Sequence, residues 1–68
     1  MFEAGQRVRV NLAGLFLSGV SFGRAVTDAL ATIVQQTSSD PSRYSVKLLF
    51  AFKGVTEVEV PEDRIKAA

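Results

Sequence analysis

The stretch from Tyr44 to Val60, YSVKLLFAFKGVTEVEV, decides the fold of this chain. It contains two runs, 44–50 and 56–60, in which apolar and polar residues alternate, as they do in strands with one buried face. The apolar face of the first run consists of Tyr44, Val46, Leu48 and Phe50. In the second run both glutamates face solvent, and Pro61 ends the strand because proline has no amide hydrogen for a ladder. The sequence therefore predicts a β-hairpin in this half of the chain.

The length of the hairpin loop follows from the residues that each register would pair. A loop of residues 53–54 alone would place Phe50 opposite Glu57 and bury a carboxylate. A loop of residues 52–54 keeps both glutamates in solvent and puts Gly54 at the left-handed position of a bulge. This register pairs Leu48 with Val58, Val46 with Val60, and Lys47 with Glu59. We therefore predict the three-residue loop.

Residues before the hairpin predict two further elements. Gln6–Val10 alternates in the same way, with Val8 and Val10 facing inward. Residues 22–36 fit two structures, because apolar residues recur there with helical spacing. A strand over Ala31–Gln36 is favoured, since β-branched residues disfavour a helix and no capping box begins one. The alternative is an α+β fold, with one helix over 22–36 packed on an antiparallel sheet.

Length and composition limit the possible functions. A chain of 68 residues is one domain, residues 1–68, and 47% hydrophobic with 22% charged residues is typical of a globular protein. The chain has no cysteine and no histidine, so disulfides, histidine-ligated zinc and histidine-based catalysis are excluded. We therefore expect a protein that is not an enzyme and that binds no metal and no cofactor.

The sequence also predicts a cytoplasmic protein. Met1–Gly5 lacks the basic and apolar regions of a secretory signal. The longest uncharged run, Asn11–Gly23, is shorter than the ~20 apolar residues that span a bilayer. We expect no association with a membrane.

The order of these segments resembles the SH3-like small β-barrel superfamily. The resemblance rests on Gly5–Val10, the long loop after it, Ala31–Val34, the Tyr44–Val60 hairpin and the run Val60–Ile65. It implies an all-β fold, a five-stranded small barrel with a long first loop and a short last strand. Barrels of this kind serve many unrelated functions, so the fold by itself assigns none.

Two groups of such barrels are loosely similar to this chain. Type II dihydrofolate reductases form their ligand pore with a Val-Gln-Ile-Tyr run in a late strand. The corresponding run here, Val58–Pro61, reads Val-Glu-Val-Pro, and Val58 alone matches outright, so the resemblance does not favour reductase activity. Orphan barrels encoded on gene cassettes are also similar and imply no particular chemistry.

The first loop is the most unusual feature, because a barrel of this size has little room for its large apolar residues. These are Leu12, Leu15, Phe16, Leu17, Val20 and Phe22. Some of them should be exposed, and exposed apolar clusters usually mark interfaces. We therefore predict a partner-binding surface formed by Leu15, Phe16, Leu17, Phe22, Phe52 and Lys53. The other interpretation is that the loop folds back as a hairpin over the barrel.

The leading functional hypothesis is a non-enzymatic binding module that forms homo-oligomers, with a dimer favoured, and that could also bind another protein. One alternative is an oligomeric barrel of the small-ligand-binding or reductase type. Another is a single-stranded nucleic-acid binder, in which Tyr44 and Phe52 stack bases beside Arg7, Arg9 and Lys53. The net charge of +1 argues against strong attraction to nucleic acid.

Overall fold

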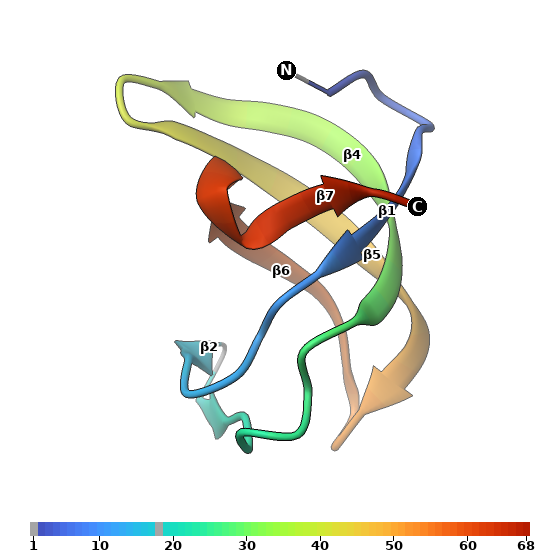
Figure 1. Ribbon diagram of the computed structural model, residues 1–68, viewed down its shortest axis with the longest axis vertical. Coiled ribbons are helices and arrows are strands. Elements are labelled where there is room, and N and C mark those ends of the chain that lie inside the picture. Colours follow the sequence, from blue (N-terminus) through green and yellow to red (C-terminus); the bar gives the residue numbers. More distant parts are fainter. Residues whose placement is uncertain (1, 18) are drawn as a thin grey trace.

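The computed structural model describes residues 2–17 and 19–68, which are mostly β-strand (Figure 1). The elements are β1 (Arg7–Val10), β2 (Phe16–Leu17), β3 (Val20–Ser21), β4 (Ala29–Ser39), β5 (Ser42–Phe52), β6 (Val55–Pro61), the 3-10 helix η1 (Glu62–Arg64) and β7 (Ile65–Ala67). These residues form no α-helix, so the helix over 22–36 is wrong. The predicted strand in that region is confirmed as part of β4. No helix in the described part of the chain is long and apolar enough to cross a membrane.

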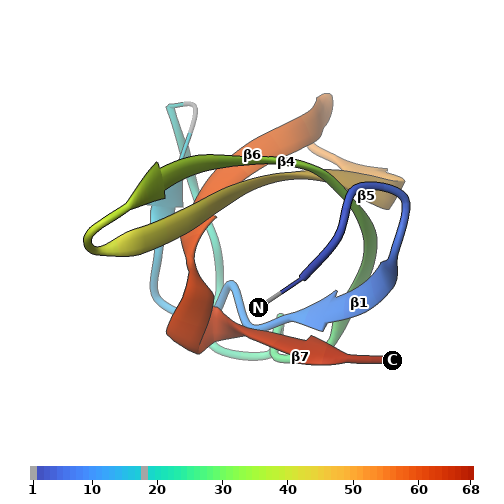
Figure 2. The same cartoon turned by 90° about the horizontal axis from the view of Figure 1, so that it is seen from above.

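The main sheet has five antiparallel strands in the order β6-β5-β4-β1-β7, and β2 pairs with β3 in a separate hairpin. Figure 2 shows the main sheet curling around the interior, so that β1 and β7 lie across from β5 and β6. Among the described residues no ladder joins β6 to β7, and these two strands remain the edges of an open sheet. The fold is therefore a small, strongly curved, all-β structure.

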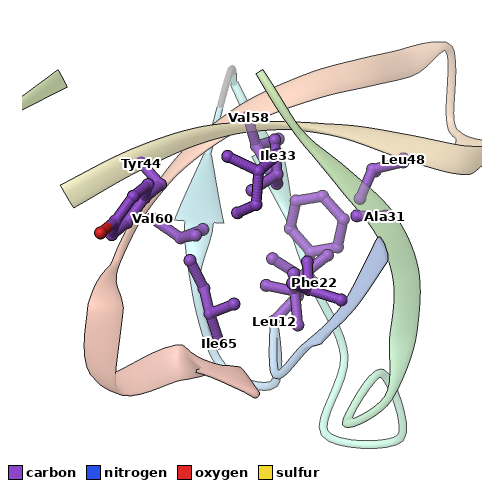
Figure 3. Close-up of a cluster of buried hydrophobic side chains, with 12 residues drawn as sticks. Leu12, Phe22, Ala31, Ile33, Tyr44, Leu48, Val58, Val60 and Ile65 are labelled. Atoms are coloured by element: carbon purple, nitrogen blue, oxygen red, sulfur yellow. The ribbon is translucent and has the colours of Figure 1, made fainter. Parts of the chain in front are cut away.

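The core lies inside this curl and follows from the alternation of apolar residues along each strand (Figure 3). Val8 and Val10 of β1 are completely buried, while the arginines between them and before them face solvent. The complete core is Val8, Val10, Leu12, Phe22, Ala31, Ile33, Tyr44, Val46, Leu48, Val58, Val60 and Ile65. Every one of these side chains is apolar except for the Tyr44 hydroxyl, which accepts a hydrogen bond of 3.2 Å from the Phe2 amide. Strand alternation thus accounts for most of the interior.

The β5–β6 register differs from the prediction. Phe52 pairs with Val55, so the loop contains Lys53 and Gly54 alone, both with positive φ. The three-residue loop is therefore wrong. The two-residue turn buries no carboxylate because residues 48–51 of β5 form an irregular bulge opposite Thr56. Beyond the bulge the observed pairs are Val46 with Val58, Tyr44 with Val60, Lys47 with Glu57 and Ser45 with Glu59.

The bulge also changes the environment of Phe50. The sequence places Phe50 on the buried face, yet its side chain is 77% exposed. Neither neighbouring strand pairs with β5 at this position, because the ladder with β4 ends at Leu48 and the ladder with β6 is interrupted. Without paired strands the inward face of β5 does not continue to Phe50.

The first loop folds back, as in the second interpretation of its sequence. The amide of Phe22 donates a 2.8 Å hydrogen bond to the Leu15 carbonyl, and β2 pairs with β3. The Leu12 amide donates to the Val26 carbonyl at 2.9 Å, which ties the start of the loop to its end. Leu12 and Phe22 belong to the core as a result. The loop therefore buries more apolar surface than the sequence predicts.

Candidate functional site

Two segments that are distant in the sequence meet at one end of the molecule. The ring of Phe22, from the first loop, stacks on the ring of Phe52 at the end of β5, with centroids 4.7 Å apart and an interplanar angle of 26°. The ammonium of Lys53 lies 5.7 Å from the centre of the Phe52 ring, within the range of a cation–π interaction. β2 and the last residues of β5 both lie at the lower end of the molecule in Figure 1. We call this region the aromatic end and define it by Phe16, Leu49, Phe50, Phe52 and Lys53.

The structure separates the four predicted partner-binding residues of the first loop into three groups. Phe22 is 2% exposed, so its side chain supports Phe52 from within the core. Leu15 and Leu17 are half-buried and pack against the core. Phe16 is 71% exposed, because its neighbours in the loop turn toward the interior and Phe16 points the other way. Of the predicted loop residues, Phe16 is the one whose side chain is open to a partner.

Two further exposed residues at the same end of the molecule are absent from the surface that the sequence predicts. Leu49 is 47% exposed and Phe50 is 77% exposed, and both lie in the bulge of β5. The alternating pattern does not predict the exposure of Phe50, since it assigns this residue to the buried face. The available signal was Leu48-Leu49-Phe50 itself, because three consecutive large apolar residues cannot all face inward on a strand.

A second surface feature is a polar groove of about 260 Å³ beside β1 and β7. Antiparallel pairing places Arg9 opposite Lys66. Just after β1, the backbone N–H of Asn11 donates a 2.8 Å hydrogen bond to the backbone carbonyl of Arg64. Thr27 and Asp28, just before β4, line one side, and Asp63 lies near Arg64. The polar groove is defined by Arg9, Asn11, Thr27, Asp28, Asp63, Arg64 and Lys66.

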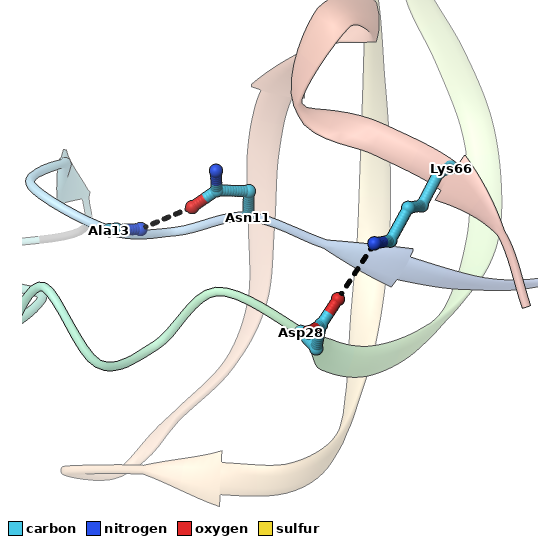
Figure 4. Close-up of polar contacts among 4 residues, drawn as sticks. All are labelled: Asn11, Ala13, Asp28 and Lys66. Carbon is cyan, nitrogen blue, oxygen red and sulfur yellow. Dashed lines mark hydrogen bonds and ion pairs between the residues drawn. The ribbon is translucent and has the colours of Figure 1, made fainter.

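Contacts within the protein hold several groove side chains in place. The Lys66 ammonium lies 3.1 Å from an Asp28 carboxylate oxygen, and the Asn11 side-chain oxygen accepts a 3.0 Å hydrogen bond from the Ala13 amide (Figure 4). Arg64 donates from Nη1 to the Ala13 carbonyl at 3.3 Å. The Arg9 guanidinium makes no hydrogen bond or ion pair with any residue in 2–17 or 19–68. The groove therefore contains donors that are held in position and one arginine, Arg9, that has no hydrogen-bond or ion-pair partner among the described residues.

The run that corresponds to the reductase pore motif lies in a different environment here. Val58 and Val60 are buried in the core, and the Glu59 carboxylate lies 3.5 Å from the Arg43 guanidinium on the outer face. Glu57 accepts a 3.2 Å hydrogen bond from the Ser45 hydroxyl on that face. Both carboxylates thus have neighbours on β5 that account for their positions. In the described ranges, no three side chains of the metal-ligating kinds gather into a cluster.

Comparisons of this chain with models of known protein families, with curated proteins and with solved structures find no match. Its function is therefore inferred from the two surfaces described above.

Proposed function

We propose that this chain is a non-enzymatic SH3-like interaction module that self-associates through its aromatic end. The observation that carries the proposal is the exposure of Phe16 in β2 and Phe50 in β5, which are 71% and 77% exposed. The stack of Phe22 on Phe52 joins the two segments that hold them, because Phe16 pairs with Ser21 next to Phe22 and Phe50 lies two residues before Phe52. Isolated exposed apolar residues are normal in proteins, whereas clusters of them mark contact surfaces. Leu49, 47% exposed, adds apolar surface next to Phe50 in β5, and half-buried Phe52 follows on the same strand.

The arrangement of the strands supports the SH3-like part of the proposal. β4, β5 and β6 form a consecutive meander, and η1 leads from β6 into a short last strand. That last strand, β7, pairs with β1. The long connection between β1 and β4 contains the β2–β3 hairpin. An opening strand, a long first loop, a three-strand meander and a short last strand are the features of the barrels that the sequence resembles.

A second copy of this chain is the proposed occupant of the aromatic end. A 68-residue chain without cysteine has few means of gaining stability apart from packing, and association is one of them. Burying Phe16 and Phe50 against another copy contributes about 3–6 kcal/mol, before the cost of association is subtracted. A net charge of +1 imposes little repulsion between identical copies. A two-fold dimer is the simplest closed arrangement.

The required area shows how much of the aromatic end must take part. Stable dimers bury about 800 Å² on each partner. The surface of this chain is 4226 Å², so an interface of that size covers about a fifth of it. Phe16 alone offers far less area, and we therefore expect contributions from both β2 and the bulge of β5.

Light scattering coupled to size-exclusion chromatography tests the proposal. We expect the wild-type protein to form dimers at micromolar concentration, and both Phe16→Asp and Phe50→Asp to be monomers. Val34→Asp is the matched control, because Val34 is 38% exposed and lies in β4, outside the aromatic end. A wild-type protein that stays monomeric up to about a millimolar contradicts self-association.

A thermal-shift screen separates this proposal from the ligand-binding alternative. A ligand present at 100 times its Kd adds about 2.7 kcal/mol to the free energy of unfolding. We expect folate and NADPH to leave the melting temperature unchanged. A saturable increase with either compound favours the oligomeric ligand-binding barrel.

A further inference from the structure

We propose that the polar groove binds a phosphate group. The groove lies beside β1 and β7, and none of the residues that define the aromatic end lines it. It brings together the cations Arg9, Arg64 and Lys66 and the carboxylates Asp28 and Asp63, so its formal charge is positive by one. The proposal therefore concerns a different surface from the one that mediates self-association.

The distribution of ion pairs makes part of this positive charge available. Asp28 lies 3.1 Å from Lys66, so each of these two charges already has a partner. Arg64 has its Nη1 donating to the Ala13 carbonyl, and its other N–H groups stay free to donate to a ligand. Arg9 has no partner among the described residues. Two guanidinium groups thus face a groove in which one carboxylate, Asp63, has no ion-pair partner in the described chain.

The placement of the donors on three segments favours phosphate over a carboxylate. Arg9 lies on β1, Arg64 precedes β7, and Thr27 lies on the segment that leads into β4. Asn11 presents its amide NH₂ away from Ala13, because its oxygen accepts the Ala13 hydrogen bond (Figure 4). Donors from three segments match a tetrahedral group with several acceptor oxygens, whereas a carboxylate offers two oxygens in one plane.

The size of the groove limits the ligand. Pockets for drug-sized molecules have volumes of about 300–1,000 Å³. The polar groove, at about 260 Å³, is smaller and suits a phosphate with a small substituent or one phosphate of a longer strand. Free phosphate, a mononucleotide and single-stranded nucleic acid share this chemistry, and the experiment must distinguish among them.

An NMR titration at constant ionic strength tests the site with three probes: inorganic phosphate, adenosine 5′-monophosphate and a short oligothymidylate. We expect saturable shifts for the backbone amides of 9–11 and 63–66 and for the side-chain NH₂ of Asn11. Arg9→Gln should weaken binding about tenfold or more, since hydrogen bonds between charged groups are among the strong ones. Arg7→Gln is the matched control, because Arg7 is the preceding outward residue of β1 and does not line the groove.

A second variant is expected to strengthen phosphate binding, so its effect cannot be explained by a loss of folding. Asp63→Asn removes the unpaired carboxylate, so it should tighten phosphate binding by about two- to fivefold. Saturation by phosphate or the mononucleotide supports a small-molecule site. Saturation by the oligothymidylate alone, lost in Arg9→Gln, supports a strand as the source of the phosphate. The proposal is overturned if no probe saturates, if acetate binds as tightly as phosphate, or if Arg7→Gln and Arg9→Gln weaken binding equally.

Discussion

The two halves of β5 carry the same kind of apolar sequence and lie in opposite environments. In the first half Tyr44, Val46 and Leu48 are buried, and the residues between them lie on the outer side. In the second half Leu49 and Phe50 are both exposed. The first half pairs with β4 on one side and with β6 on the other. In the second half the ladder with β4 has ended and the ladder with β6 is interrupted until Phe52.

This difference shows what an alternating pattern can and cannot specify. Alternation determines which residues share a face of a strand. It does not determine how far the neighbouring strands and the core extend along that face. In β5 the sheet stops covering the inner face after Leu48, and an apolar residue beyond that point becomes surface that is open to a partner.

The largest expected difference between the halves comes from two adjacent leucines. Leu48→Ala should lower the free energy of unfolding by about 2–5 kcal/mol, because it leaves a cavity in the core. Leu49→Ala, the matched control, should cost under about 1 kcal/mol, since that side chain is half exposed. Urea unfolding of both variants measures the two costs. Equal costs would show that the bulge is absent in solution and that the face of β5 continues.

A glycine substitution tests the turn that forces the bulge. Gly54 has φ of +82° in the two-residue loop, so Gly54→Ala should destabilise the protein by about 1–2 kcal/mol. Gly23→Ala is the control, because Gly23 has no positive φ and a methyl group added there would meet no atom within 4 Å. Thermal unfolding followed by circular dichroism compares the two. A harmless Gly54→Ala would contradict the turn over Lys53 and Gly54.

A double-mutant cycle measures the contact between the first loop and the second half of β5. Phe22→Leu, Phe52→Leu and the double variant should give a coupling energy of about 0.5–1.5 kcal/mol, as expected for stacked rings. Chemical unfolding of the four proteins provides the values. Additive costs would mean that the two rings do not stack in solution and that the aromatic end is less ordered than described.

The smallest expected effect on folding is that of Phe50→Ser. At concentrations where the protein is monomeric, this variant should change the free energy of unfolding by about 0.5 kcal/mol or less, because the side chain is already in solvent. Unfolding curves at low and high protein concentration separate folding from association. A loss of several kcal/mol at low concentration would place Phe50 in the core, as the alternating pattern predicts.

The main features of the fold could be predicted from local residue patterns. Alternation in Gln6–Val10 and in the Tyr44–Val60 stretch correctly identified the strands and most of their buried faces. The strand in β4 was the favoured of two interpretations, and pairing with both β1 and β5 explains why it is not a helix. The crowded apolar residues of the first loop predicted that some of them would be exposed, and Phe16 is.

The loop length, the burial of Phe22 and the exposure of Phe50 required the tertiary structure. The predicted register assumes a regular ladder from the turn onward, and an irregular bulge satisfies the same burial requirement with a shorter loop. Phe22 is buried because it meets Phe52, a residue that is distant in the sequence. Local patterns carry no information about such a meeting.

The polar groove depends still more on the tertiary structure. Arg9 and Asn11 lie near the start of the sequence, whereas Arg64 and Lys66 lie near its end, and each is an ordinary polar residue in its own segment. They become neighbours because β7 pairs with β1 in one particular register. The sequence by itself determined which residues of each strand share a face, since this follows from the two-residue repeat of a strand. Strand pairing decided which outward residues of different strands lie on one surface. Pairing brings together segments that are distant in the sequence, and it depends on how the whole chain packs.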